Sequence, residues 1–248
     1  MDCLKSLESQ TLDKKLFKVL IVLNGDKEPY YSLIEKWLDG LNCQTELIYT
    51  FEKGVSNARN LALDSVTSSY IAFIDDDDYV SPHYLESLLE CAESSPIGTI
   101  ACSDVRTFDI NNKFGRDYIS RAYTFAVDNS EKKSLVSRRS FLSSSCCKLI
   151  PTALIGKRRF NAKVRIGEDA LFMATISDMI KAIVPASSDA IYYRRLRPNS
   201  ASRRKEPFCD RIKRKSSLIS IYLNIYFSAF PKYNSIFFIT RILAIIKG

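Results

Sequence analysis

Residues 70–85, YIAFIDDDDYVSPHYL, constrain the fold of this chain more than any other segment. A short apolar run ends at four consecutive aspartates, Asp75 to Asp78, which is typical of a buried strand that carries carboxylates to the mouth of a sheet. Four adjacent anions repel one another unless something neutralises them, and a divalent cation with hard oxygen ligands is the natural partner. An acidic surface turn is the alternative interpretation of this segment taken alone.

Strands and helices alternate along the first hundred residues. The segment 17–23 (FKVLIVL) is almost wholly apolar, as expected of a strand covered on both faces. A helix is predicted over residues 29–41, a strand over 45–51, a helix over 54–66 and a strand over 98–103. This alternation predicts an α/β fold with a mostly parallel, Rossmann-like sheet and helices on both faces, in which ligands bind at the carboxyl ends of the strands.

The second half of the chain is less regular. Residues 106–145 are polar and basic, which favours a substrate-facing insertion with loops over a part of the central sheet. A helix is expected over 167–180, and short strands over 182–185 and 190–193. The composition changes after Pro207. We therefore predict one α/β domain over residues 1–205 and a basic, apolar, helical C-terminal region over residues 206–248.

The C-terminal region combines basic residues with apolar residues at helical spacing, among them Leu218, Ile221, Tyr222 and Ile225. This pattern fits an amphipathic helix on an anionic membrane surface. A helix packed on the domain core is the alternative, and the two remain open from the sequence.

Charge and cysteine content limit the class of protein. The net charge of +8 suits an anionic partner such as a nucleotide or a phospholipid surface. Seven irregularly spaced cysteines fit reduced thiols in the cytosol better than a disulfide framework. No signal peptide and no apolar run of membrane-spanning length is visible. Nucleic-acid binding is not expected, because there is no recognised motif and no basic stripe interleaved with aromatic residues.

Four blocks of the sequence resemble the family 2 glycosyltransferases of the GT-A fold, especially bacterial enzymes of surface-polysaccharide assembly. The blocks are KGVSNARNLAL (Lys53–Leu63), residues 70–85, IGEDALF (Ile166–Phe172) and YYRRLRPNSAS (Tyr192–Ser202). They occur in the family's order and cover roughly residues 2–205. The resemblance implies a GT-A glycosyltransferase domain that binds a nucleotide sugar, with a UDP-sugar as the first choice.

The resemblance also implies roles for the acidic residues. Asp77 would coordinate Mn²⁺ or Mg²⁺ on the donor diphosphate, and Asp75 would lie near the ribose or the water shell of the metal. Asp76 and Asp78 would orient metal-bound water. Asp169 would be the catalytic base that takes the proton of the acceptor hydroxyl. The alternative for Asp169 is an acid that only complements the helix dipole.

Other polar residues are expected to contact the donor. Arg194 and Arg197 would approach the pyrophosphate, since guanidinium groups suit phosphate oxygens, although a plain basic surface is the alternative. Lys53 and Asn60 lie near the start of a helix at the strand ends. Asn24 ends the first predicted strand, at the edge where ligands bind.

The beginning of the chain departs from the family pattern. Family members start with an apolar strand and a nucleotide-binding turn, followed by a helix that resembles residues 2–11 (DCLKSLESQT) of this chain. The family's first strand is therefore expected to be missing, and residues 17–23 match its second strand. That strand ends here in Asn24-Gly25-Asp26 in place of the family's DDGS. Either the true start lies upstream, or the chain is a shortened and impaired transferase.

The sequence thus favours inverting transfer of a sugar from a nucleotide sugar to a glycan or lipid-linked acceptor in bacterial surface-polysaccharide synthesis. The expected location is the cytoplasm, including the cytoplasmic face of the inner membrane. One alternative is a catalytically impaired homologue that binds sugar nucleotides or partner enzymes. Another is a basic membrane-associated or nucleic-acid-associated protein in which the acids are incidental.

Overall fold

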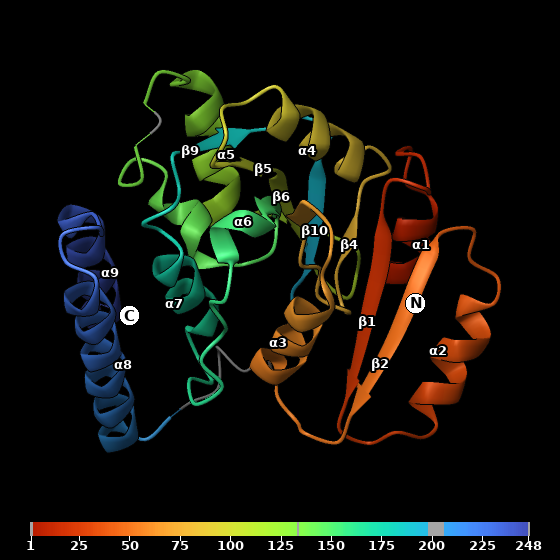
Figure 1. Ribbon diagram of the computed structural model, residues 1–248, viewed down its shortest axis with the longest axis horizontal. Coiled ribbons are helices and arrows are strands. Elements are labelled where there is room, and N and C mark those ends of the chain that lie inside the picture. The colour runs from red at the N-terminus through yellow and green to blue at the C-terminus, as the bar shows by residue number, and fades with distance from the viewer. Residues whose placement is uncertain (1, 133, 198–205, 248) are drawn as a thin grey trace.

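A computed structural model describes residues 2–132, 134–197 and 206–247. Figure 1 shows three parts side by side. The strands β1 and β2 with the helix α2 form one end, a body of strands covered by helices forms the middle, and a hairpin of two helices, α8 and α9, forms the other end. No helix among the described residues is both long enough and apolar enough to cross a membrane.

The first half of the chain alternates helices and strands as predicted. Gly54, at φ +128°, lets the chain turn from β2 into α3, because glycine lacks the Cβ that disfavours positive φ. The elements are, in order, α1 (Asp2–Glu8), β1 (Lys18–Asn24), α2 (Tyr30–Leu38), β2 (Gln44–Thr50), α3 (Val55–Ser65), β3 (Tyr70–Ile71), β4 (Tyr79–Val80), α4 (Tyr84–Glu93) and β5 (Thr99–Cys102). The strands and helices predicted for this half are among them, with shifts at their ends, whereas β4 was not predicted.

The second half contains more regular structure than predicted. Its elements are β6 (Asp104–Phe108), β7 (Phe114–Arg116), α5 (Tyr118–Asp128), the 3₁₀ helix η1 (Arg139–Ser143), β8 (Lys148–Pro151), α6 (Thr152–Ile155), α7 (Glu168–Thr175), β9 (Ala182–Pro185) and β10 (Ile191–Arg195). The prediction of a loop-rich insertion over 106–145 is wrong, because β6 pairs with β10 in a sheet. The segment is polar because its strands carry exposed side chains such as Arg106 and Arg116, whereas Val105 near the start of β6 is buried.

The α/β class is confirmed, and the strand pairing is mixed. The described strands form three sheets, in the orders β1-β2, β4-β10-β6-β7 and β3-β8-β5-β9. Parallel pairing joins β1 to β2, β6 to β10 and β5 to β9. The other four pairings, β4–β10, β3–β8, β5–β8 and β6–β7, are antiparallel. Short connections such as the one between β6 and β7 permit only antiparallel neighbours, whereas a parallel pair needs a long crossover.

The sheet β1–β2 stands apart from the others. Within the described residues β1 pairs with β2 alone, over the register from Lys18–Gln44 to Asn24–Thr50. The apolar side chains of β1 are only half-buried, and α2 contributes no buried residue. Among the described residues, β1 therefore has one strand neighbour.

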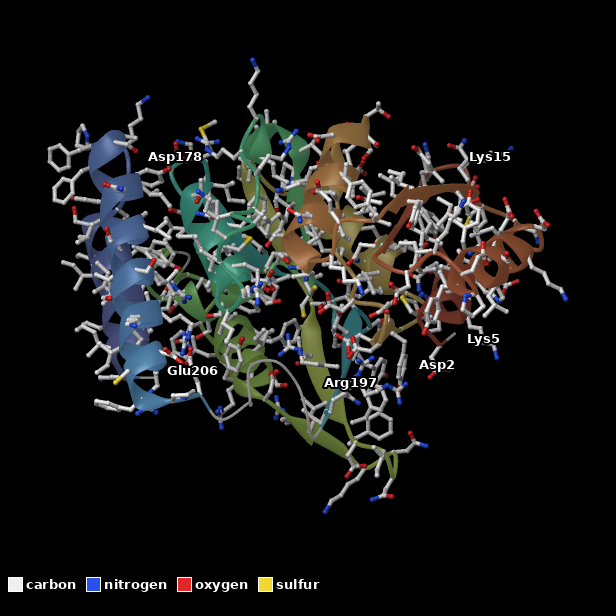
Figure 2. The ribbon with its side chains drawn as sticks, turned by 90° about the horizontal axis from the view of Figure 1, so that it is seen from below. Asp2, Lys5, Lys15, Asp178, Arg197 and Glu206 are labelled. Carbon is white, nitrogen blue, oxygen red and sulfur yellow. The ribbon has the colours of Figure 1, made fainter. Side chains whose placement is uncertain are left out.

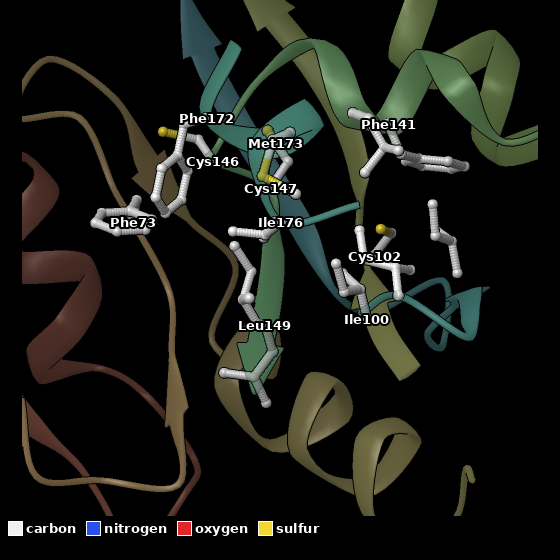
Figure 3. Packing of buried hydrophobic residues seen from close by; sticks show 14 of the residues in the cluster. Phe73, Ile100, Cys102, Phe141, Cys146, Cys147, Leu149, Phe172, Met173 and Ile176 are labelled. Atoms are coloured by element: carbon white, nitrogen blue, oxygen red, sulfur yellow. The ribbon is translucent and has the colours of Figure 1, made fainter. Parts of the chain in front are cut away.

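The core lies under the central strands and is continuous with the C-terminal hairpin. Figure 3 shows Phe73, Leu149, Phe172 and Met173 among its side chains. Phe172 and Met173 come from α7, so this helix is fixed in the core directly after its polar first turn. Full burial of such large apolar side chains stabilises the fold by roughly 1.5–3 kcal/mol each.

The hairpin comprises α8 (Phe208–Ser228) and α9 (Ser235–Lys247). Leu218, Tyr222, Phe237 and Phe238 are buried and belong to the same core cluster as the rest of the body. The alternative of helices packed on the core is therefore confirmed for one side of the hairpin. The predicted boundary between residues 205 and 206 lies at the edge of a segment outside the described residues and stays a prediction.

Candidate active site

The four consecutive aspartates form a turn at the end of the buried strand segment. Phe73 is buried and bridges to Cys146, after which the chain leaves the core at Asp75. The Asp78 amide donates to the Asp75 carbonyl over 3.1 Å and so closes the turn. This turn brings one carboxylate oxygen each of Asp75, Asp77 and Asp78 to within 4.8 Å of one another. Asp76 is exposed and lies outside this cluster, which we call the carboxylate cluster.

Two arginines, the last residue of β10 and one just beyond it, contact the carboxylate cluster. Arg197, labelled in Figure 2, places its Nε 2.8 Å from Asp77 Oδ2. Arg195 donates its backbone N–H to Asp78 Oδ1 over 2.8 Å, and its Nε to the Asp77 carbonyl over 3.0 Å. The structure therefore brings the predicted Arg197 to the cluster, together with Arg195, which the sequence pattern did not single out.

Burial makes the carboxylate cluster unfavourable for negative charge. Asp78 is only 3% exposed, and burial raises its pKa to about 6. Burial also raises the pKa of Asp77, against the opposing effect of Arg197. Carboxylate oxygens are the ligands that Mn²⁺ and Mg²⁺ prefer, and a bound cation would stabilise the ionised forms. The residues present therefore fit a divalent cation.

Asp169 lies in the first turn of α7, close to the cluster. Gly167, at φ +87°, precedes the helix and allows the chain to turn into it. The Asp169 side chain is 20% exposed, and it accepts hydrogen bonds from Ser145 Oγ over 3.0 Å and from Ser144 Oγ over 3.4 Å. Burial, and next the adjacent carboxylate of Asp169, raise the pKa of Glu168. Asp169 is thus held by hydroxyl donors while part of its carboxylate stays accessible.

Arg59 of α3 connects Asp169 to the carboxylate cluster. Its Nη1 forms an ion pair with Asp169 Oδ1, and its Nη2 lies 2.8 Å from Asp75 Oδ1. The Arg59 guanidinium also lies over the rings of Phe160, 5.3 Å away, and Phe73, 5.8 Å away. A guanidinium donates in two directions in its plane and stacks on aromatic faces, so it can fix both carboxylates at once. The sequence pattern did not single out Arg59, which directly precedes Asn60 in the same helix.

Asn60 has a structural contact in place of the expected donor contact. Its Nδ2 donates to the Phe160 carbonyl over 2.9 Å, and its Oδ1 accepts from the Phe160 amide over 2.7 Å. Both polar atoms of the amide are therefore used to hold the backbone of Phe160. Phe160 stacks on Phe172 with 3.8 Å between ring centroids. By holding the backbone of Phe160, Asn60 helps to position the ring over which the Arg59 guanidinium lies. The structure does not bring Asn60 to the carboxylate cluster.

Asn24 and Lys53 lie together at the carboxyl ends of β1 and β2. Asn24 Oδ1 accepts from the Gly54 amide over 3.1 Å, which ties the end of β1 to the start of α3. The Lys53 ammonium is exposed and lies 3.3 Å from Asp26 Oδ1. Both residues occupy the edge predicted for ligand contacts, with Lys53 able to reorient because its ion pair is exposed.

Arg194 points away from the carboxylate cluster. Its Nη1 lies 2.6 Å from Asp117 Oδ2, and its Nη2 lies 3.5 Å from Cys147 Sγ. Asp117 also caps α5 by accepting from the amides of Ile119 and Ser120. Successive side chains of a strand point to opposite faces, so Arg194 and Arg195 of β10 have different partners. That alternation is the sequence signal that distinguishes Arg195 and Arg197 from Arg194.

The sequence matches a known family. The model of the family described as "Glycosyl transferase family 2" matches residues 2–154, which is more than half of the chain. The chain belongs to glycosyl transferase family 2.

Two curated bacterial proteins illustrate what the chain is similar to. The chain is 24% identical over 194 residues to the poly(ribitol-phosphate) beta-N-acetylglucosaminyltransferase TarS of Staphylococcus aureus, covering 77% of this chain and 32% of TarS. It is 30% identical over 95 residues to the succinoglycan biosynthesis protein ExoM of Rhizobium meliloti, covering 38% of this chain and 31% of ExoM. The chain thus spans about a third of the length of these curated relatives.

Solved structures of other glycosyltransferases share the fold. TarS residues 1–349 in complex with UDP-GlcNAc superpose with a TM-score of 0.65 at 20% identity, covering 89% of this chain and 61% of that one. The mannosyltransferase PcManGT of Pyrobaculum calidifontis, in complex with GDP-Man and Mn²⁺, gives a TM-score of 0.60 at 13% identity, covering 98% and 63%. The expected GT-A fold is confirmed by these similarities.

Proposed function

We propose that this protein is an inverting glycosyltransferase, which moves one sugar from a nucleotide-sugar donor to a glycan or lipid-linked acceptor in bacterial surface-polysaccharide synthesis. The observation that carries this proposal is the link through Arg59, which holds Asp169 beside the carboxylate cluster. A family 2 chain with a cation-binding cluster and a separate, oriented carboxylate has the two groups that glycosyl transfer with inversion needs.

Asp169 would act as the general base. In an inverting transfer one carboxylate accepts the proton of the acceptor hydroxyl while the hydroxyl oxygen attacks the anomeric carbon opposite the leaving group. The contacts of Asp169 with Arg59, Ser144 and Ser145 orient its carboxylate. Its partial exposure leaves room for an acceptor.

The carboxylate cluster would hold the donor through Mn²⁺ or Mg²⁺. Asp77 would be the main ligand, Asp75 would lie near the ribose or the water shell of the metal, and Asp76 and Asp78 would support that shell. When bound, the cation would stabilise the charge that develops on the diphosphate leaving group. PcManGT was solved in complex with Mn²⁺ as well as GDP-Man, which supports a divalent metal for this fold.

Basic and polar residues around the cluster would bind the rest of the nucleotide sugar. Arg197 would reorient from Asp77 toward a diphosphate, which offers the same kind of oxygen acceptor. Asn24 and Lys53 would contact the nucleoside side of the donor. TarS has been solved with UDP and with UDP-GlcNAc, which supports a UDP-sugar as the donor. For Arg194 and Asn60 a donor role would require them to leave their present partners.

The acceptor and the location follow from the same proposal. Relatives named for poly(ribitol-phosphate) glycosylation and succinoglycan biosynthesis support a glycan or polymer of the bacterial surface as acceptor. A lipid-linked acceptor would place the enzyme in the cytoplasm as a peripheral protein on the inner face of the membrane.

A catalytically impaired homologue that binds sugar nucleotides is the second candidate. The observation that favours it is that β1 and β2 pair only with each other among the described strands. A strand with one neighbour is held less firmly, so this side of the proposed nucleotide site would be less stable. Such a protein would bind donor without transferring sugar.

The deciding experiment compares wild type with Asp169→Asn. Transfer is followed by mass spectrometry of a panel of glycan acceptors with a UDP-sugar and Mn²⁺, and donor affinity by calorimetry. We expect wild type to transfer, and Asp169→Asn to lose roughly a hundredfold or more of the rate while donor affinity stays similar. Donor binding without transfer by wild type would favour the impaired homologue, and equal rates for both proteins would rule out Asp169 as the base.

A further inference from the structure

The C-terminal hairpin leaves apolar side chains unpacked on a side of each helix that does not face the core. In Figure 2 the hairpin forms one end of the molecule, with side chains projecting from its outer side. Phe227 is 66% exposed and Ile236 is 62% exposed. The large exposed apolar residues of the hairpin are Phe208, Ile212, Leu223, Phe227, Phe230, Ile236, Ile239, Leu243 and Ile246.

These residues form a stripe on each helix. At 100° per residue, Phe208, Ile212, Leu223 and Phe227 fall within about 100° of arc on α8. Ile236, Ile239, Leu243 and Ile246 fall within about 100° of arc on α9 by the same reckoning. The buried residues of α8 and α9 lie on other sides of the two helices. We call these two stripes, together with Phe230 in the turn between the helices, the outer face.

The hairpin is also strongly basic. Residues 206–247 contain seven Lys or Arg and two acidic residues, a surplus of five positive charges within a chain of net charge +8. One of the acids, Glu206, is paired with Arg214 at 3.0 Å. Arg211 and Lys213 near the start of α8, and Lys247 at the end of α9, are exposed at the same end of the hairpin, where the Lys215 Nζ reaches the Ile246 carbonyl over 3.1 Å. One end of the outer face is therefore flanked by exposed basic residues.

We infer that the outer face docks onto a bilayer surface that contains anionic phospholipids, which deepens the proposed action on a lipid-linked acceptor. Apolar stripes inserted at the headgroup boundary and cations beside them are the two components of interfacial helix binding. The positive charge of the hairpin favours an anionic bilayer over a second copy of the chain as the partner. A two-fold interface brings the same surface together twice, so the basic ends of two copies would add like charge to one contact, whereas anionic headgroups neutralise it.

The test is co-sedimentation of the full chain with vesicles, without any sugar nucleotide. The vesicles contain phosphatidylcholine alone, or phosphatidylcholine and phosphatidylglycerol in about a 2:1 ratio. We expect binding to the anionic vesicles at about 0.1 M NaCl, and weaker binding to neutral vesicles or at about 0.5 M NaCl. Because each cation near an anionic surface contributes about fivefold, the triple variant Arg211→Gln, Lys213→Gln, Lys247→Gln should bind anionic vesicles roughly a hundredfold more weakly.

Two matched variants test whether vesicle binding depends on the outer face in particular or on any exposed apolar side chains. The variant Phe227→Ser, Ile236→Ser, Leu243→Ser removes three side chains of the outer face and should weaken binding to anionic vesicles by more than about tenfold. The control variant Phe51→Ser, Ile97→Ser, Ile110→Ser removes three apolar side chains outside the hairpin that are even more exposed, and it should bind as wild type does. Both variants should keep the wild-type melting temperature, since the replaced residues are exposed.

Three results would overturn the inference. Wild type could stay in the supernatant with every vesicle, or the control variant could lose binding as much as the outer-face variant. Wild type could also form a dimer by light scattering that the outer-face variant converts to monomer, which would make the outer face a contact between copies. None of these measurements depends on glycosyl transfer, and transfer to a soluble acceptor by the outer-face variant reports on the proposed function separately.

Discussion

Arg59 pairs with Asp169 across 110 residues of sequence. The same guanidinium holds Asp75, so the distance between the proposed base and the carboxylate cluster is set by one side chain. The Arg59 guanidinium lies over the aromatic rings of Phe73 and Phe160, which help to fix its position. Arg59 is thus a positioning residue for the proposed chemistry.

Replacing Arg59 with lysine should therefore impair transfer more than folding. Lysine keeps the positive charge but cannot reach two carboxylates with a forked group, so the rate of sugar transfer should fall roughly tenfold to a hundredfold. Steady-state transfer assays measure this, and Arg159→Lys is the matched control, because Arg159 binds Asp64 on an exposed surface. Equal loss of rate in both variants would show that Arg59 has no special role.

Asp77→Ala should abolish metal-dependent donor binding. Asp77 belongs to the carboxylate cluster, and removal of one ligand would weaken the proposed cation site, which would also hold the diphosphate. Calorimetry of a UDP-sugar with Mn²⁺, and again with EDTA, measures the effect. The control is Asp76→Ala, which removes an exposed acid outside the cluster and should change donor affinity much less. Similar affinities of wild type and Asp77→Ala would contradict the assignment.

Asp78→Asn should stabilise the metal-free protein at neutral pH. The pKa of Asp78 is raised from 3.8 to about 6, so this group contributes most stability when protonated, below its unfolded pKa, and that contribution is lost as the pH rises through about 6. The cost of the ionised form is roughly 3 kcal/mol. In EDTA at pH 7.5 the variant should melt roughly 5–10 °C higher, and at pH 4 the difference should nearly vanish. A variant that melts lower than wild type at pH 7.5 would show that the charge is stabilising.

Asn60→Ala should lower stability without changing donor affinity. The variant leaves the Phe160 amide and carbonyl without the partners they have in the structure, which costs roughly 1–3 kcal/mol for each buried group. The melting temperature should fall by several degrees, whereas Asn57→Ala, which removes a longer exposed bond to Lys53, should leave it unchanged. A loss of donor affinity larger than the loss of stability would restore the sequence-based prediction that Asn60 contacts the donor.

Local patterns predicted the elements that a single segment determines. The apolar run at β1 and the acids after Phe73 are such cases, because burial periodicity and like-charge repulsion act between near neighbours. The sequence did not predict that β6 joins the sheet between β10 and β7, since the segment that follows it is polar and β6 itself carries the exposed Arg106. Asp169 was identified only through a resemblance, because an acid in the first turn of a helix is common.

The contacts that build the site were harder to predict. Arg59, Ser145 and Asp169 lie on three separate segments, and only the packing of α3 against the body makes them neighbours. Asn60 and Arg194 were expected at the donor because their side chains can bind phosphate or sugar oxygens. In the structure Asn60 binds the backbone of Phe160, and Arg194 binds Asp117, which caps α5. Such partners occur throughout any protein, so a sequence pattern does not predict them.

The separation of β1–β2 has a consequence for motion. A pair of strands bonded only to each other, with half-buried apolar side chains and a helix that buries nothing, forms a unit that can open without disturbing the rest of the core. Amide hydrogen exchange should then be faster in β1 and β2 than in β5 and β8. Asn24 belongs to this unit and Asp75 to the body, so the two groups of residues proposed to bind the donor would move relative to each other and come together when the donor binds both.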